Sequence, residues 1–201
     1  MQRINAVLKR VPTLSLYIAG VVPLIWLVVL LFTGGLGVDP VKALEHRVGK
    51  IGLQFMIAVL AVTPLRRFFG LNLIKFRRAL GLLTFLYIVV HLAVWLALDI
   101  QFYWAEIWAD ILKRPYITIG MTGFVLMLPL AVTSNNASIK RMGPAGWKML
   151  HKLTYLAALA GALHYVWLVK GWQYEPLVYM GGIILLLGLR IRVNRKRAAR
   201  I

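Results

Sequence analysis

Six long apolar segments, separated by short stretches rich in Gly, Pro or charged residues, constrain this chain more than any other feature. A helix needs roughly 20 apolar residues to cross a bilayer, so 201 residues leave room for about six crossings. The predicted spans are residues 14–32, 51–64, 79–98, 116–133, 150–169 and 177–189. A content of 61% hydrophobic and only 15% charged residues is typical of membrane proteins. We therefore predict an all-α membrane protein, a six-transmembrane-helix bundle that forms one domain over residues 1–201, without an internal sequence repeat.

The distribution of charge predicts the orientation of the bundle. The chain has 24 Lys and Arg residues against six Asp and Glu, a formal charge of +18. If the N-terminus is cytoplasmic, eighteen of the cations and no acid fall in cytoplasmic segments, and all six acids fall outside. Such an excess of cations in cytoplasmic loops predicts that both termini are cytoplasmic. No soluble domain presents the charge to nucleic acid, so anionic lipid headgroups of the bilayer are the expected partner of these cations.

The absence of cysteine excludes several kinds of covalent link and metal site. Without any cysteine the chain forms no disulfide, ligates no iron–sulfur cluster and attaches no c-type haem covalently. It also contains no phosphate-binding loop and no Gly-rich dinucleotide fingerprint. Histidine is therefore the expected ligand for any metal held within the membrane.

Two of the four histidines are expected at the same depth on different helices. His91 lies about twelve residues into the third span, and His164 lies thirteen residues beyond His151, about 20 Å along a helix axis. Ionisable groups at this depth are costly and usually functional. Two neutral imidazoles on separate helices suit the two faces of a haem, whereas a structural zinc needs four ligands. The alternative is a pair of histidines hydrogen-bonded to neighbouring helices. His46 is expected in the first external loop as a surface residue, with a loop ligand or a partner contact as the alternative.

His151 is predicted to lie at a second site near the cytoplasmic side. No fourth histidine is expected at its depth, and the residues 13 and 14 positions before His91, just ahead of the third span, are Arg78 and Arg77. Arginine suits a haem propionate or a flavin phosphate rather than iron. On an ideal helix His151 and His164 point about 140° apart, so a shared face requires a distortion, for which Gly161 is a candidate.

The segment "DIQFYWAEIWADILKRPY", residues 99–116, mixes aromatic and acidic side chains between two spans. This pattern predicts a helix at the membrane interface with an aromatic belt. The same surface is a candidate docking site for an external electron acceptor.

The order of several motifs resembles a known family. These motifs are "GGLGVDPV" after the first span, "TPL" at the end of the second, "RRALG" leading into "VVHL", "RPYITIG", "TSNNASIKRMGPAGWKMLHKLTYL" and "LHYVWLVK". Together they resemble the haem-binding membrane subunit of the periplasmic methionine-sulfoxide reductase system. That family belongs to the ferric reductase-like transmembrane group, which includes the NADPH oxidases.

The resemblance implies a haem b protein of the bacterial inner membrane. Such a subunit takes electrons from the quinone pool or a cytoplasmic flavin reductase. It passes them to a soluble periplasmic molybdopterin subunit, which carries the catalysis and repairs oxidised methionines. His91 and His164 match the ligands of the outer haem, and His151 matches the inner-site histidine. Arg77 and Arg78 depart from the four-histidine pattern of the wider group, so the resemblance implies one haem or two. Flavin mononucleotide is also associated with the family.

Two other functions remain open from the sequence. A transmembrane reductase could act directly on ferric iron or another small external acceptor. A proton-coupled transporter without redox chemistry could use the histidines as a proton relay, although the predicted spans contain no acidic residue. A plain membrane anchor would leave the histidines without a role.

Overall fold

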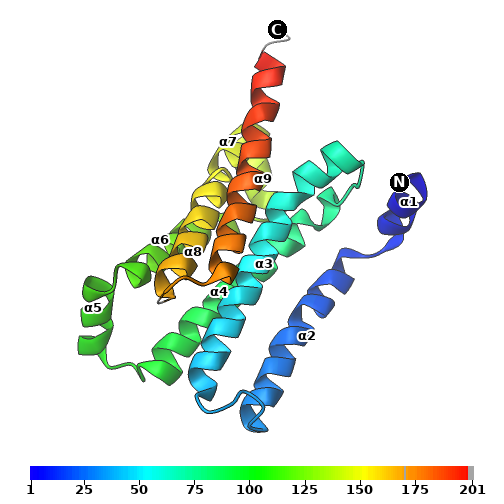
Figure 1. The fold of residues 1–201 in the computed structure, drawn as a ribbon. Helices are drawn as coiled ribbons and strands as arrows, with labels where there is room; N and C mark the ends of the chain where they lie inside the picture. Colours follow the sequence, from blue (N-terminus) through cyan, green and yellow to red (C-terminus); the bar gives the residue numbers. More distant parts are fainter. Residues whose placement is uncertain (170, 199–201) are drawn as a thin grey trace.

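The computed structural model describes residues 1–169 and 171–198, with side chains up to Arg190, and this part of the chain contains helices and no strand (Figure 1). The α-helices in order are α1 (Gln2–Arg10), α2 (Thr13–Phe32), α3 (Pro40–Phe69), α4 (Arg77–Val94), α5 (Trp104–Lys113), α6 (Pro115–Val132), α7 (Asn136–Leu150), α8 (Leu153–Leu168) and α9 (Tyr174–Ala198). A short 3-10 helix, η1 (Ile74–Phe76), precedes α4, and a π-helix, η2 (Trp95–Asp99), follows it.

Four of these helices are long and apolar enough to cross a membrane. They cover Thr13–Phe32, Pro40–Phe69, Ile74–Asp99 and Pro115–Val132, while α8 is apolar but only 16 residues long. The chain is therefore a multi-pass membrane protein. The count of six spans stays a prediction, as does the treatment of residues 1–201 as one domain.

The second predicted span, residues 51–64, lies within a much longer helix, α3, which runs from Pro40 to Phe69. The Asp39 side chain caps the helix by accepting from the Lys42 N–H, and Pro40 occupies the first turn, where its missing N–H costs nothing. The helix ends at Gly70, which adopts a left-handed φ of 68°. Thirty residues make this helix about 45 Å long. His46, predicted in a loop, is therefore an exposed residue of α3.

The boundary between α7 and α8 also differs from the prediction. The fifth span was expected to begin at residue 150, with Gly161 as a candidate position for a distortion, yet α8 begins at Leu153 and continues unbroken to Leu168. The interruption lies at His151 and Lys152, which form a turn after α7. Because of this turn, His151 and His164 do not lie on one continuous helix. The angle of about 140° expected between them therefore does not apply, and no distortion at Gly161 is needed.

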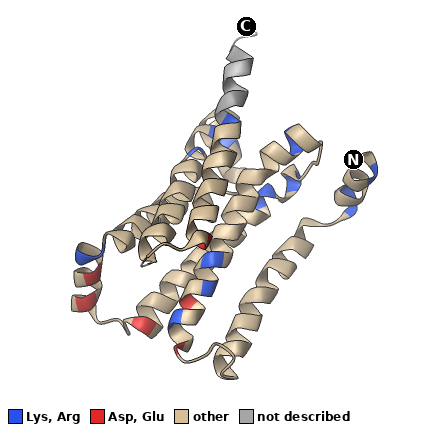
Figure 2. Ribbon diagram, in the orientation of Figure 1, with Lys and Arg blue, Asp and Glu red and all other residues tan. Residues whose placement is uncertain are grey.

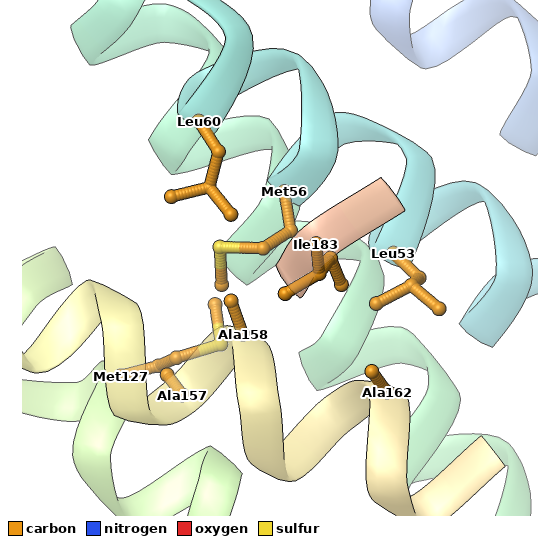
Figure 3. Packing of buried hydrophobic residues seen from close by; sticks show 8 residues of the cluster. All are labelled: Leu53, Met56, Leu60, Met127, Ala157, Ala158, Ala162 and Ile183. Atoms are coloured by element: carbon orange, nitrogen blue, oxygen red, sulfur yellow. The ribbon is translucent and has the colours of Figure 1, made fainter. Parts of the chain in front are cut away.

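Small side chains let α8 lie close to its neighbours in the centre of the bundle. Figure 3 shows the packing of this core, to which α8 contributes three alanines. The other members are Leu53, Met56, Leu60, Met127 and Ile183, from α3, α6 and α9. Close van der Waals packing of this kind is what holds helices together in lipid, where the hydrophobic effect between helices is absent.

Helix α2 lies at the edge of the bundle (Figure 1). Many of its large apolar side chains are exposed. Its fixed point is Gly20, whose carbonyl accepts a 2.7 Å hydrogen bond from the buried Tyr87 hydroxyl of α4. Leu83 packs on the same glycine. The exposed apolar surface of α2 fits contact with lipid.

Charge is distributed unevenly along the bundle. Helix α1 and the last turns of α9 lie at one end (Figure 1), and acidic residues gather in the half of the molecule away from them (Figure 2). Some of the cations counted in the predicted charge distribution lie outside the residues whose side chains are described. These are Lys170, Arg192, Arg195, Lys196, Arg197 and Arg200.

Candidate functional site

His91 projects from α4 toward α3, where a backbone carbonyl fixes its ring. Its Nδ1 lies 2.9 Å from the carbonyl oxygen of Glu45. A carbonyl oxygen only accepts hydrogen bonds, so Nδ1 carries the proton and donates it. The unprotonated Nε2 of a neutral imidazole is then the nitrogen free to bind a metal.

His164 is held in the same way by the second pair of helices. It projects from α8 toward α6, and its Nδ1 lies 2.7 Å from the carbonyl oxygen of Tyr116. The same argument leaves its Nε2 as the free nitrogen. Helices α3 and α4 thus present one imidazole, and α6 and α8 present another with the same tautomer.

The structure brings these two imidazoles together. Their ring centres are 6.1 Å apart, with an angle of 78° between the ring planes. Two metal–nitrogen bonds of about 2 Å, with about 1.2 Å from each nitrogen to its ring centre, would put the ring centres about 6.4 Å apart. The observed separation therefore fits one metal held between two axial imidazoles. Among the residues whose side chains are described, no group of three or more His, Asp or Glu could hold a metal ion.

Both histidines line a cavity of about 710 Å³, a volume within the usual range for cofactor pockets. Apolar residues from α3, α6 and α8, among them Met56, Met127 and Ala157, line the part within the core. A second group of lining residues is charged: Lys42, Glu45, Arg47, Lys50, Asp99, Arg114 and Glu175. A flat apolar macrocycle with two carboxylates matches such a mixed lining, so the residues present fit a haem.

An ion pair joins two elements beside this cavity. Lys50 Nζ of α3 lies 3.0 Å from Glu175 Oε1 at the start of α9. Its hydrogen bond to Glu175 lowers the pKa of that carboxyl below its ordinary value. The pair links α3, which carries an anchoring carbonyl, to the last helix of the bundle.

His151 lies apart from the other two histidines, in the turn between α7 and α8. Its ring stacks on Trp147, with centres 3.7 Å apart, and its Nε2 lies 3.2 Å from Thr133 Oγ1. The Thr133 hydroxyl already donates its proton to the Pro129 carbonyl. Nε2 of a neutral His151 must therefore be the donor to Thr133, which leaves Nδ1 unprotonated, opposite to the tautomer at His91 and His164.

The two arginines predicted near His151 have different surroundings. Arg77 is half-buried, and its charge acts on both His151 and Arg190. Arg78 donates a 2.8 Å hydrogen bond to the Asn136 side chain at the start of α7.

Arg190 is a feature that sequence reasoning missed. It donates to the Tyr155 hydroxyl at 2.8 Å and to the Leu60 carbonyl at 2.7 Å, while its Nε is buried without a hydrogen-bond partner in the described part of the chain. In the sequence Arg190 only marks the end of the last apolar run. Its burial under α3 and α8 follows from packing that the sequence does not display.

Sequence reasoning also missed the carbonyls of Glu45 and Tyr116, because any residue supplies a carbonyl. The only sequence signal was that each of these residues stands four positions before a glycine, Gly49 or Gly120. That spacing becomes informative only once the neighbouring helices are known.

Comparison with known proteins identifies the family. A family model described as the ferric reductase like transmembrane component matches residues 48–162. Heme-binding subunits of protein-methionine-sulfoxide reductase, named MsrQ, match most of the chain. The subunit of Agrobacterium fabrum is 48% identical over 177 residues, which are 88% of this chain and 82% of the relative. That of Brucella anthropi is 45% identical over 189 residues, 92% and 86% of the two chains.

This chain belongs to the MsrQ family. The predicted resemblance is thereby confirmed. The span covered by the ferric reductase-like model contains His91 and His151 and ends two residues before His164. The roles assigned to individual residues of this MsrQ family member stay predictions.

Proposed function

We propose that this chain is a b-type cytochrome subunit that relays electrons across the bacterial inner membrane to a periplasmic molybdopterin-containing methionine-sulfoxide reductase. The relatives named as heme-binding subunits support the haem and the reductase system. The observation that carries the proposal is the pair of carbonyl-anchored imidazoles, 6.1 Å apart and lining one cavity.

His91 and His164 would hold the haem, which supplies one-electron chemistry when bound. The carbonyls of Glu45 and Tyr116 keep each Nδ1 protonated and each Nε2 available. They also fix the direction of each ring, as the outer partners of metal-bound histidines generally do. Apolar residues of α3, α6 and α8 line the part of the cavity within the core.

The orientation follows from charge. We place both termini in the cytoplasm and count α8 and α9 as the fifth and sixth spans. The acidic half of the bundle then faces the periplasm (Figure 2), and the charged lining of the haem cavity lies toward that side. An electron at the His91 and His164 site would be near the periplasmic surface.

Electrons would enter on the cytoplasmic side near His151. The unprotonated Nδ1 of this ring could accept a proton from a quinol, and the Arg77 and Arg190 guanidiniums suit an anionic group such as a flavin phosphate. Because Nε2 of His151 is bound to Thr133, we favour one haem at the outer site and a quinone or flavin mononucleotide at the inner site.

Helix α5 is the proposed docking surface for the periplasmic reductase, which would carry the catalysis. It begins with exposed Trp104, continues with exposed Trp108 and includes Glu106 and Asp110. Aromatic side chains of this kind are enriched at protein interfaces.

The proposal is tested by following the haem spectrum of the purified protein during turnover. A quinol or a flavin reductase should reduce the haem, and the periplasmic reductase should reoxidise it only when methionine sulfoxide is supplied. Reoxidation by a ferric chelate at the same rate without the reductase would instead favour direct reduction of iron. A colourless, folded protein prepared with haem supplied would contradict the proposal and return the transporter hypothesis.

A further inference from the structure

We propose that Gly49 and Gly120 are positioning residues for the two axial histidines, each making room for an imidazole against a neighbouring helix. This inference rests on the proposed haem-binding function. Neither glycine would touch the haem iron. Each would act through the histidine that packs on it.

Gly49 of α3 lies directly under His91. A Cβ added at position 49 would come within 2.9 Å of His91 Nδ1 and 3.1 Å of Cε1. Carbon atoms do not approach a ring this closely, so a methyl group there would have to displace the imidazole or helix α4. The atom it meets first is the one that donates to Glu45.

Gly120 of α6 repeats this arrangement under His164. A Cβ at position 120 would lie 2.8 Å from His164 Nδ1 and 3.1 Å from Cε1. Again the nearest atom is the ring nitrogen that donates a hydrogen bond to a backbone carbonyl, here that of Tyr116. The Nδ1 distances differ by only 0.1 Å between the two pairs and the Cε1 distances are equal, so the structure builds the same contact twice.

The geometry of the α-helix explains why glycine occupies both positions. Glu45 precedes Gly49 by four residues, and Tyr116 precedes Gly120 by four. In an α-helix the carbonyl of residue i already accepts the N–H of residue i+4. At both sites the imidazole reaches that carbonyl from beside residue i+4, where a Cβ would stand in the way of the ring.

Glycines one turn further along each helix provide matched controls. A Cβ at Gly52 would meet Ile88 Cδ1 at 2.9 Å and Tyr87 Cβ at 3.2 Å, and a Cβ at Gly123 would meet Ala160 Cβ at 3.3 Å. Both lie in the same helix contacts and also line the cavity, so they control for lost cavity volume, but neither touches an imidazole. Alanine at position 52 or 123 would press on side chains of the neighbouring helix. Alanine at position 49 or 120 would press on the imidazole of His91 or His164.

The experiment compares haem binding by Gly49→Ala and Gly120→Ala with that by Gly52→Ala and Gly123→Ala. Haem per chain, the low-spin ferric spectrum and the haem midpoint potential are measured on each detergent-purified protein. Loss of an outer partner of a metal-bound histidine weakens metal binding on the order of 10- to 100-fold. We expect a loss of this size, with a shifted spectrum and potential, only in the 49 and 120 variants.

Two outcomes would overturn the inference. One is a pair of 49 and 120 variants that match the wild type in haem content, spectrum and potential. The other is equal damage in the 52 and 123 variants, which would make all four glycines simple packing residues. If the wild-type protein binds no haem, the proposed function is contradicted instead. The steric contact between each glycine and its histidine is then tested by the double variants described next.

A double variant keeps the test decisive if Gly49→Ala does not fold. When the methyl group collides with the imidazole, removing the ring in Gly49→Ala/His91→Ala should restore a helical, monodisperse protein. If that double variant remains unfolded while His91→Ala alone folds, the glycine serves helix packing and the inference is wrong. The Gly120→Ala/His164→Ala variant applies the same test to the second pair.

Discussion

Removing the Tyr87 hydroxyl should loosen α2 from the rest of the bundle by a measurable amount. Tyr87 is fully buried, and its hydroxyl donates a 2.7 Å hydrogen bond to the Gly20 carbonyl of α2. This bond ties the outermost long helix to α4 one turn before His91. In Tyr87→Phe the ring and its packing remain, so the change isolates the hydrogen bond.

The expected loss of stability follows from the partner that remains. The Gly20 carbonyl keeps its place in the helical ladder of α2, so it is not left wholly unsatisfied. A net hydrogen bond contributes about 0.5–1.5 kcal/mol in soluble proteins, and about 0.6 kcal/mol on average within a bilayer. We expect Tyr87→Phe to lower the free energy of unfolding by about 1 kcal/mol, roughly a fivefold change in the unfolding equilibrium.

The assay is reversible unfolding in mixed micelles with increasing denaturing detergent, followed by helical circular dichroism. Tyr17→Phe makes the same chemical change on α2, where Tyr17 is only half-buried and makes no side-chain hydrogen bond in the described part of the chain. It should leave stability unchanged. Equal effects of the two substitutions, or a loss above about 3 kcal/mol, would refute the reasoning.

Three further outcomes are expected. The ring planes of His91 and His164 are 78° apart, so a haem held between them as proposed should give the strongly anisotropic low-spin ferric signal of near-perpendicular ligands in electron paramagnetic resonance; a signal of parallel ligands would contradict that arrangement. The Lys50–Glu175 pair lowers the pKa of the Glu175 carboxyl, so it stabilises the fold above the ordinary carboxyl pKa and loses this effect as the pH falls through the lowered value. Glu175→Gln should therefore be slightly less stable than the wild type near neutral pH, by no more than about 1 kcal/mol for a half-exposed pair, and the difference in thermal midpoint should narrow as the pH falls below the ordinary carboxyl pKa. Replacing Trp104 and Trp108 by alanine should slow reoxidation of the haem by the periplasmic reductase without changing haem content, whereas unchanged reoxidation would exclude α5 as the docking surface.

The sequence predicts helices well where apolar runs coincide with whole helices. The first predicted span, residues 14–32, is nearly identical to Thr13–Phe32, and the fourth, residues 116–133, to Pro115–Val132. It fails at α3, because Lys42, Glu45 and Arg47 interrupt the apolar pattern without interrupting the helix. Polar residues are ordinary in a helix that extends beyond the hydrocarbon region or lines a cavity.

The pairing of His91 with His164 follows from arithmetic that the sequence supports. A constant rise of 1.5 Å per residue puts both side chains at one depth once the order of the spans is known. The position of His151 could not be obtained in this way, because a turn at His151 and Lys152 breaks the helix on which the calculation relies.

The anchors of the histidines lie beyond sequence reasoning for a different reason. The groups that fix His91 and His164 are backbone carbonyls, and the residues that admit the rings are glycines, which have no side chain to suggest a role. Their significance depends on which helices are neighbours, and α3 with α4 and α6 with α8 are paired only in three dimensions.

The most direct test of haem binding between His91 and His164 is the number of haems per chain, measured as reduced pyridine haem against quantitative amino-acid analysis. The wild type should hold about one haem, which His91→Ala and His164→Ala should each abolish. His151→Ala should retain it, and so should His46→Ala, which removes the exposed histidine that lines the same cavity. Haem that survives in both His91→Ala and His164→Ala, or that is lost only in His151→Ala, would contradict the proposed site.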